Sequence, residues 1–310
     1  MLPLLAAQES RAREVLPAEV LAWVLDGSGD GAFEGAWRSL RLRPHVLRDV
    51  TSVDVALDLL GTPLGSPILV GPTAFHDRLH PAAESATAAG ARAAGSLMVW
   101  SMRASRPFEG TGWWQVYVLR DRQATLEHCL RARDAGASAL VLTGDTPYLG
   151  TARRGPLDDL DQAPDATLDD IGWLAAETGL PVLVKGVLRR DDALDCLRAG
   201  AAGLVVSNHG GRQLSRTVPT AEVLPEVVDA VEGRVPVLVD GGIRSGLDVL
   251  CALALGASAV LVGKPVMWAL ASDGAAGVEA CLRGLSDDLA FVMGLAGCCS
   301  LTDVDRSLLA

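Results

Sequence analysis

The chain is poor in lysine, in tyrosine and in paired cysteines. Its 27 basic residues include only two lysines, Lys185 and Lys264, and its only tyrosines are Tyr117 and Tyr148. None of its six cysteines forms a CxxC pair or stands at metal-ligand spacing from a histidine. We therefore expect no metal site, and reduced thiols in a cytoplasmic protein.

The chain also lacks a surplus of positive charge and a long apolar segment. Its net charge of −11 at pH 7 argues against non-specific binding to nucleic acid or to an anionic membrane. The first 15 residues, MLPLLAAQESRAREV, hold only a short apolar patch and predict neither a signal peptide nor a membrane anchor. We expect a folded protein with no nucleic-acid or membrane partner.

Eight short apolar runs, each bounded by Gly, Pro or Ser, recur along the chain. They read PILVG, SLMVW, WWQVYV, ASALVLT, PVLVK, GLVVS, VPVLVD and SAVLVG. Continuous apolar runs are typical of strands that are buried on both faces of a parallel sheet. Ala- and Leu-rich segments with helical spacing, such as residues 121–136, separate most of them. Eight such units predict a (β/α)₈ TIM barrel, with a doubly wound open sheet as the alternative. The segment between the second and third runs is short for a helix.

Residues 1–60 precede the first run and contain no such unit. The stretch LLAAQESRAREVLPAEVLAWVL has the spacing of one or two helices, and residues 42–61 favour a loop and a strand that lead into the barrel. We predict that this segment caps the barrel and that residues 1–310 form a single domain.

Polar residues follow the predicted strands, where a barrel of this kind places its chemistry. Two glycine turns, DGGIRSG at 240–246 and VGKP at 262–265, come after the last two strands. Glycine lets backbone N–H groups approach an anion, and a helix that begins there adds partial positive charge. Each turn by itself is equally well explained as structural. Together, after adjacent strands, they predict a phosphate-bearing ligand.

The stretch SNHGGRQL follows the sixth run and places His209 three residues before Arg212. An arginine can hold a carboxylate through two parallel hydrogen bonds, and a nearby histidine can take a proton near neutral pH. A single loop histidine is more often only solvated. The other histidines lack such a setting, and we interpret them as structural or surface residues: His45, His76, His80 and His128.

Taken together, these motifs resemble the FMN-dependent α-hydroxy acid oxidases and dehydrogenases, the family of glycolate oxidase, lactate oxidase and mandelate dehydrogenase. The likeness covers most of the chain, through LRPHVLRDVTSVD, PTAFHDRLHP, WWQVYVLRDR, LTGDTP, PVLVKGVL, SNHGGRQL, LVDGGIRSGLDVL and GLAGCCSL. It implies FMN as cofactor and oxidation of a 2-hydroxy acid to the keto acid by hydride transfer to flavin N5. It further implies O₂ or another electron acceptor, and a homotetramer.

The resemblance also implies a role for each strand-end residue. His209 is expected to act as the active-site base with Asp145 polarising it, and Arg212 as the carboxylate clamp. Tyr117 is expected to hydrogen-bond the substrate, and Lys185 to stabilise the reduced flavin. The expected flavin-lining residues are Pro72, Thr73, Ala74, Ser101, Gln115, Thr143 and Ser207. Asp240 is expected to hold the ribityl hydroxyls, and the phosphate is assigned to Gly241, Gly242, Arg244, Gly263 and Lys264.

The chain departs from the family pattern at four points. Trp23 stands where the family has a substrate-binding tyrosine, and Lys264 replaces an arginine, which loses a bidentate fork. In DTPYLGTARRG the second carboxylate-binding arginine is shifted, which leaves Arg153 or Arg154 as its substitute, and the loop at 148–168 is short. Arg103 is an additional cation in reach of substrate.

These departures leave the substrate open. A similar aromatic replacement occurs in relatives that resemble 4-hydroxymandelate oxidase, so an aryl, mandelate-like hydroxy acid is the expected substrate. One alternative is an FMN-dependent tailoring oxidase that acts on a non-standard substrate in a biosynthetic pathway. The others are a catalytically silent FMN-binding protein and a flavin-free lyase or isomerase that binds phosphate.

Overall fold

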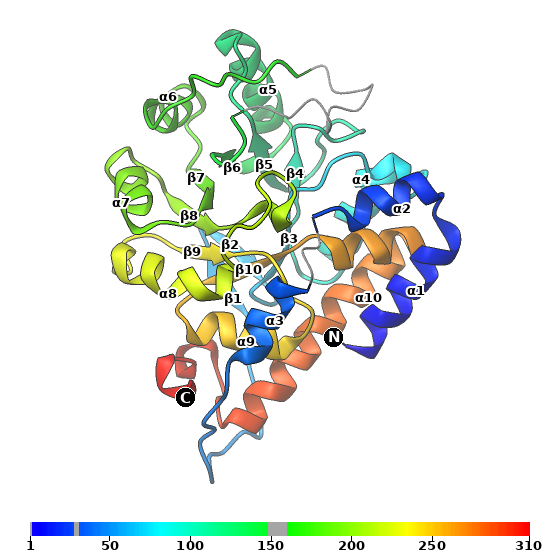
Figure 1. Ribbon diagram of the computed structural model, residues 1–310, viewed down its shortest axis with the longest axis vertical. Helices are drawn as coiled ribbons and strands as arrows, with labels where there is room; N and C mark the ends of the chain where they lie inside the picture. Colours follow the sequence, from blue (N-terminus) through cyan, green and yellow to red (C-terminus); the bar gives the residue numbers. More distant parts are fainter. Residues whose placement is uncertain (1, 28–30, 148–159) are drawn as a thin grey trace.

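Eight parallel strands form the barrel (Figure 1). The computed structural model describes residues 2–27, 31–147 and 160–310. The strands are β3 (Ile68–Val70), β4 (Val99–Ser101), β5 (Gly112–Val116), β6 (Ala137–Thr143), β7 (Val182–Val187), β8 (Gly203–Val206), β9 (Val237–Val239) and β10 (Ala259–Val262). They pair in the order β3-β10-β9-β8-β7-β6-β5-β4. A parallel bridge from Val70 to Met98 joins the two ends of this order. The barrel prediction is confirmed, and the open sheet is wrong.

Alternation along the strands explains why the runs are apolar throughout. Side chains such as Leu69, Val141 and Leu238 belong to a cluster inside the barrel. Their strand neighbours, such as Ile68 and Val239, belong to the larger cluster that includes the helices. Because successive residues of a strand point to opposite faces, burial on both faces requires every position to be apolar.

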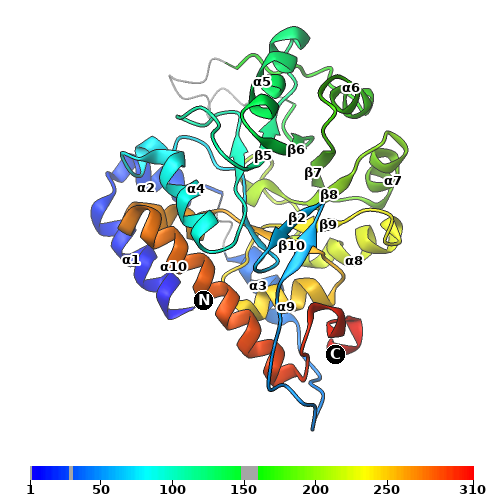
Figure 2. The same cartoon turned by 180° about the vertical axis from the view of Figure 1, so that it is seen from behind.

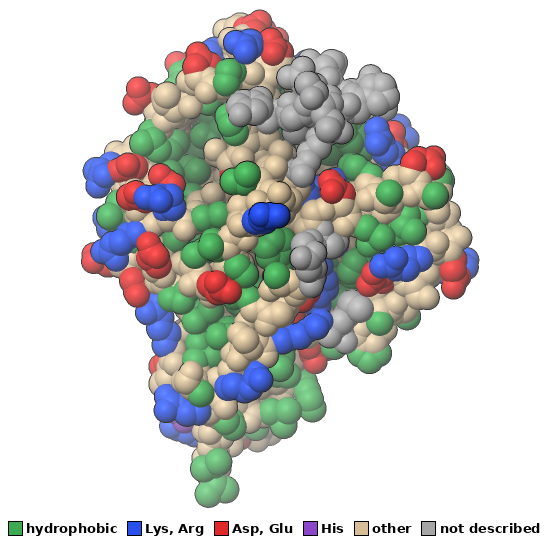
Figure 3. Space-filling view, in the orientation of Figure 1, with side chains coloured by type: hydrophobic (Ala, Val, Ile, Leu, Met, Phe, Trp, Pro, Cys, Tyr) green, Lys and Arg blue, Asp and Glu red, His purple; other side chains and the backbone are tan. Residues whose placement is uncertain are grey.

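Helices cover the outside of the barrel. They are α4 (Ala83–Ala93), α5 (Arg122–Asp134), α6 (Asp169–Thr178), α7 (Arg190–Arg198), α8 (Thr220–Val231), α9 (Gly246–Ala254) and α10 (Lys264–Ala296), followed by the short turns η4 (Leu301–Asp303) and η5 (Arg306–Leu308). Residues 102–111, between β4 and β5, contain no helix, as the short second unit predicts. No helix among the described residues is long and apolar enough to cross a bilayer. Acidic and basic side chains are interspersed on the face shown in Figure 3.

The described part of the N-terminal segment forms three helices, α1 (Pro3–Val15), α2 (Ala18–Leu25) and α3 (Ala32–Ser39). The first two lie along α10 (Figures 1 and 2), where Gln8 Nε2 donates to the carbonyl of Gly277 at 2.9 Å. The third packs on the loop after β9, where Trp37 Nε1 donates to the carbonyl of Gly241 at 2.7 Å. The sequence predicted the first two helices but not α3.

A hairpin of β1 (Leu57–Leu59) and β2 (Thr62–Leu64) precedes the barrel. Leu59 and Leu64 join the cluster inside the barrel. The hairpin lies next to Pro236 and Ser258, which come just before β9 and β10. It therefore closes the amino-terminal end of the barrel, and the carboxyl ends of the strands remain available for a site.

Candidate active site

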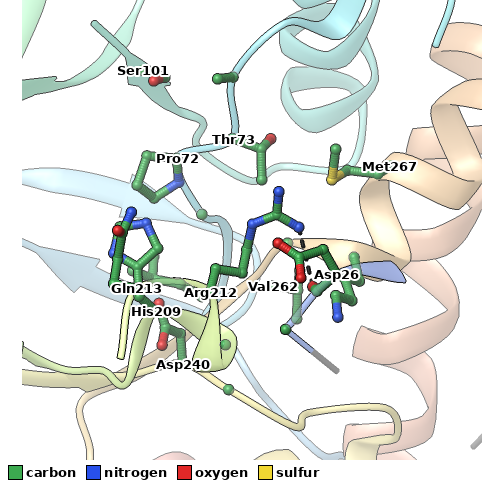
Figure 4. A pocket seen from close by; sticks show the side chains of 18 of the residues that line it. Asp26, Pro72, Thr73, Ser101, His209, Arg212, Gln213, Asp240, Val262 and Met267 are labelled. Atoms are coloured by element: carbon green, nitrogen blue, oxygen red, sulfur yellow. Dashed lines mark hydrogen bonds between the residues drawn. The ribbon is translucent and has the colours of Figure 1, made fainter. Parts of the chain in front are cut away.

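A cavity of about 490 Å³ opens at the carboxyl ends of the strands. This volume is typical of a small-molecule site. Most of the residues predicted from the sequence line it, and Figure 4 shows several of them converging. The predicted lining residues are Trp23, Pro72, Thr73, Ala74, Ser101, Arg103, Tyr117, Lys185, His209, Arg212, Asp240, Gly241, Gly242, Arg244, Gly263 and Lys264.

Four predicted site residues lie behind the cavity wall instead of lining it: Gln115, Thr143, Asp145 and Ser207. Gln115 Nε2 donates to Thr143 Oγ1 at 2.9 Å, and its Oε1 accepts from Ser101 Oγ at 3.2 Å. The buried side chains of Gln115 and Thr143 therefore fix Ser101, which lines the cavity. Arg153 and Arg154 lie outside the described residues.

His209 opens the turn η3 (His209–Gly211) in a backbone conformation that non-glycine residues seldom adopt, with φ of +54°. Such a conformation costs about 1–3 kcal/mol and persists where the surroundings enforce it. Here the His209 N–H donates to Ser207 Oγ at 3.1 Å, and the Gly210 N–H donates to Asn208 Oδ1 at 3.0 Å. Sequence reasoning missed Asn208 as a support, although it lies within the SNHGGRQL motif.

Asp145 orients the imidazole of His209. His209 Nδ1 lies 3.1 and 3.3 Å from the two carboxylate oxygens of Asp145. Burial by itself would raise the pKa of Asp145, but the hydrogen bond and charge of His209, together with Lys185, outweigh it and hold this pKa below its usual value. An ionised Asp145 accepts the Nδ1–H, which leaves the lone pair on Nε2. His209 can therefore accept a proton at Nε2.

Lys185 is buried and held by two groups. Its Nζ donates to Ser207 Oγ at 2.7 Å and lies 3.0 Å from Asp240 Oδ2. Burial lowers the pKa of Lys185, but the carboxylates of Asp240 and Asp145 more than reverse this, so that the pKa lies above its usual value. Lys185 therefore keeps a positive charge at the cavity wall across the physiological pH range.

Tyr117 and Arg103 form a second polar group in the wall. The guanidinium carbon of Arg103 lies 4.3 Å from the centre of the Tyr117 ring, and its Nη2 donates to Gln162 Oε1 at 3.1 Å. Burial raises the pKa of Tyr117, so its hydroxyl stays protonated. A protonated phenol can donate a hydrogen bond to a bound molecule.

Arg212 connects the barrel to the N-terminal segment. Its Nη1 donates to the carbonyls of Trp23 at 2.7 Å and Asp26 at 3.1 Å, and its guanidinium carbon lies 5.3 Å from the centre of the Trp23 ring. Figure 4 shows this guanidinium inside the pocket beside Asp26. A guanidinium carries five N–H donors, so it can serve a carboxylate as well as these carbonyls.

The cavity also contains an anion site. Lys264 and Arg244 line it together with the glycine turn at 241–242 and the start of α10. Burial, reinforced by the positive charges of Arg212 and Arg244, lowers the pKa of Lys264 to about 8. Two cations and backbone N–H groups at a helix start are a ready arrangement for phosphate.

At the start of α9, where the sequence predicts a contribution to this anion site, two amides are bound by side chains of the protein. The N–H of Gly246 donates to Asp288 Oδ2 at 2.5 Å, and Ser245 Oγ accepts from the N–H of Asp248 at 3.2 Å. Side chains of the protein already use these amides. The start of α10 takes the place of that helix at the cavity.

The residues present fit FMN. Asp240 Oδ1 is buried and has no hydrogen-bond partner among the described residues, which suits an acceptor for a ribityl hydroxyl. A Cβ at Gly242 would lie 2.6 Å from the carbonyl oxygen of Phe33, so only glycine allows this turn to pack as it does. The cations Lys264 and Arg244 suit the phosphate. No group of acidic, Cys or His residues in the described part of the chain could hold a metal.

His76 is a supporting residue that the sequence interpretation treated as structural or surface. It is fully buried, and its Nε2 lies 2.5 Å from Thr73 Oγ1 while its Nδ1 lies 2.9 Å from Thr87 Oγ1. Burial lowers the pKa of His76, which favours the neutral ring. His76 therefore fixes the hydroxyl of Thr73, which lines the cavity. Its position three residues after Thr73 was the available signal.

Comparison with known proteins places this geometry in a family. The profile of the FMN-dependent dehydrogenases matches residues 12–159 and 157–310. Glycolate oxidase 3 of Arabidopsis thaliana is 39% identical, over 96% of this chain and 93% of its own length. The 4-hydroxymandelate oxidase of Amycolatopsis orientalis is 41% identical, over 95% of this chain and 94% of its own.

Comparison with solved structures points to the same family. A solved structure of mandelate oxidase with (S)-2-phenylpropionate has a TM-score of 0.89 and 41% identity, over 99% of this chain and 97% of that chain. The alignment with 4-hydroxymandelate oxidase runs over 336 positions although this chain has 310 residues, so that relative contains stretches that this chain lacks. The anion site, the orphaned acceptor of Asp240 and these likenesses agree: the chain belongs to the family of FMN-dependent dehydrogenases.

Proposed function

We propose that the protein oxidises an α-hydroxy acid to the corresponding α-keto acid with FMN as cofactor. The observation that carries the proposal is the His209–Asp145 pair, because His209 lines the same cavity as Arg212 and Lys185 and Asp145 supports it from behind. FMN, when bound, supplies the acceptor for the hydrogen and the electron pair that leave C2 of the substrate. The relatives named glycolate oxidase and 4-hydroxymandelate oxidase support this substrate class.

His209 acts as the base in this proposal. Its Nε2 takes the proton of the substrate hydroxyl while the C2 hydrogen departs with its electron pair, and Asp145 stabilises the imidazolium that results. Tyr117, which keeps its proton, donates a hydrogen bond to the substrate. Lys185 keeps its positive charge at the cavity wall, where it would stabilise the negative charge of reduced FMN. Ser207 and Asp240 hold Lys185 in place for this purpose.

Arg212 binds the substrate carboxylate. Its contacts with the carbonyls of Trp23 and Asp26 fix the guanidinium before substrate arrives, which lowers the entropy lost on binding. Arg103 also lines the cavity and supplies a second cation within the same chamber. Arg153, outside the described residues, is the further arginine proposed to contact the carboxylate.

The substrate side chain is proposed to be aryl, as in mandelate. Trp23 and Phe75, with ring centres 6.3 Å apart, both line the cavity and offer an aromatic surface where a tyrosine hydroxyl was expected. The 41% identity with 4-hydroxymandelate oxidase favours the same class. The shortened loop and Trp23 instead favour the second candidate, a tailoring oxidation of a larger hydroxy acid.

The remaining proposals concern the surroundings of the enzyme. O₂ is the proposed electron acceptor, because the named relatives are oxidases. All six cysteines are free, in agreement with a reducing, cytoplasmic location. Exposed apolar side chains on α10, Phe291 and Leu295, offer surface for the proposed homotetramer. Light scattering coupled to size exclusion measures that state.

An anaerobic substrate screen tests the function. Purified holoprotein is mixed with glycolate, lactate, mandelate and 4-hydroxymandelate without O₂, and the flavin absorbance is followed. Bleaching that is fastest with the two aryl acids is expected. Bleaching with none of them, in a protein with a normal flavin spectrum, would favour the tailoring oxidase or the catalytically silent protein. A protein without flavin would contradict the proposal.

His209→Gln provides the matched variant. We expect flavin reduction to slow by about 10²–10⁴-fold, because a positioned base contributes that much, while FMN stays bound. His128→Gln on α5 changes the same residue type outside the cavity and should leave the rate of reduction normal. Retained reduction in His209→Gln would overturn the assignment of the base.

A further inference from the structure

A carboxylate stands inside the anion site. Glu34, on α3, lines the cavity, and its Oε1 lies 2.8 Å from Nη2 of Arg244. The side chains of Arg244 and Glu34 are 11% and 17% exposed. The second oxygen, Oε2, is buried and has no hydrogen-bond partner among the described residues. The guanidinium assigned to phosphate therefore already holds an anion of the protein.

The helix that carries Glu34 is fixed in place. Trp37 donates to the carbonyl of Gly241, and the carbonyl of Phe33 fills the space that a Cβ at Gly242 would need. The helix therefore packs directly on the glycine turn that lines the anion site. Glu34 can leave Arg244 by a side-chain rotation, whereas movement of the whole helix would break these contacts.

Arg244 is equally constrained. Its Nη1 donates to the carbonyl of Ile243 at 2.8 Å, and its guanidinium carbon lies 5.3 Å from the centre of the Trp268 ring. Burial lowers the pKa of Arg244, and Glu34 is the foremost group that opposes this. A phosphate that approaches this guanidinium must share it with a carboxylate of the same sign of charge.

We propose that Glu34 is an internal counter-anion of the phosphate site and reduces the share of FMN affinity that the phosphate provides. The proposal rests on the FMN site proposed above. Like charges within a few ångströms repel strongly in a partly buried site, so the carboxylate opposes the dianionic phosphate while leaving the rest of the flavin unaffected. The chain then distinguishes FMN from riboflavin less well than the two cations alone would allow.

Binding of two flavins to Glu34→Gln tests this. Flavin is removed from the protein, and FMN or riboflavin is titrated back while the quenching of flavin fluorescence is followed. We expect FMN to bind about tenfold more tightly to the variant, and riboflavin, which has no phosphate, to bind within about twofold of the original value. Glu34→Ala is measured in parallel and should shift the same ratio in the same direction.

Glu19→Gln is the matched control. Glu19 is an exposed residue of α2, so the substitution makes the same change in net charge away from the cavity and should leave both dissociation constants unchanged. Weaker FMN binding by Glu34→Gln would overturn the proposal and make Glu34 a support for Arg244. An equal change for both flavins, or no change for either, would also overturn it. Failure of every form to bind either flavin would contradict the FMN site itself.

Discussion

The two lysines of the chain line the same cavity in opposite electrostatic surroundings. Lys185 lies on β7 among carboxylates, 3.0 Å from Asp240, and its pKa is raised. Lys264 begins α10 among arginines, and its pKa is lowered to about 8. For both side chains burial is the largest single cause and acts in the same direction. The neighbouring charges decide the outcome.

The residues that surround the two lysines also come from different parts of the chain. The residues around Lys185 come from the barrel strands and the loops that follow them. The N-terminal segment reaches the other lysine, where Lys264 Nζ donates to the carbonyl of Leu25 at 3.4 Å and Glu34 holds Arg244. The departure from the family pattern at Lys264 falls on this second side. The difference teaches that the surroundings of Lys185 depend on the barrel itself, while those of Lys264 depend also on the N-terminal segment.

The largest effect is expected from Lys185→Met. Removing the ammonium leaves Asp240 as a buried carboxylate without its partner, a change that costs about 3–5 kcal/mol of unfolding free energy. Urea denaturation measures the loss. Lys264→Met is the matched comparison, and we expect it to be neutral or stabilising, since it removes a cation that its neighbours repel. Equal losses of unfolding free energy in the two variants would contradict the electrostatic difference between the two lysines.

The next effect is a pH dependence of FMN binding. In the absence of phosphate Lys264 loses its proton near pH 8, and a bound phosphate favours the protonated form, so FMN affinity should fall as the pH rises above about 8. We expect about tenfold weaker binding at about pH 9.5 than at about pH 7.5, because one charge-assisted hydrogen bond is lost. Fluorescence titration at each pH measures it.

Two controls isolate Lys264 in this experiment. Lys264→Arg keeps its charge throughout the range and should bind FMN equally at both pH values. Riboflavin, without a phosphate, should show no such dependence. A slope that persists in Lys264→Arg would show that another group is responsible.

The smallest effect is expected from Trp23→Tyr. This change returns a hydroxyl to the N-terminal side of the cavity, and one hydrogen bond to the substrate carboxylate is worth about 0.5–1.5 kcal/mol. We expect KM for the preferred hydroxy acid to fall by about 2–10-fold, with FMN binding unchanged. Trp23→Phe lacks the hydroxyl and should not lower KM. A lower KM in both variants would show that the smaller ring, and not the hydroxyl, is responsible.

Much of the fold could be predicted because local patterns determine it. The eight apolar runs correspond to β3–β10, since burial on both faces imposes continuous apolarity on each strand. The strand-end position of His209 and Lys185 followed from the same runs. By contrast, α3 has only eight residues, and no motif in its segment AFEGAWRS marks Glu34 as a site residue. Its role arises only from where the helix packs.

The amino-acid sequence by itself determined the barrel, the strand-end positions of the two lysines and the short spacing between His209 and Arg212. The family resemblance already implied that Asp145 meets His209, whereas only the tertiary structure decided that Asp240 meets Lys185 and that Glu34 meets Arg244. The physical reason is the range of the forces involved. Strand patterns reflect burial of neighbouring residues, whereas a pKa depends on groups within a few ångströms that lie far apart along the chain.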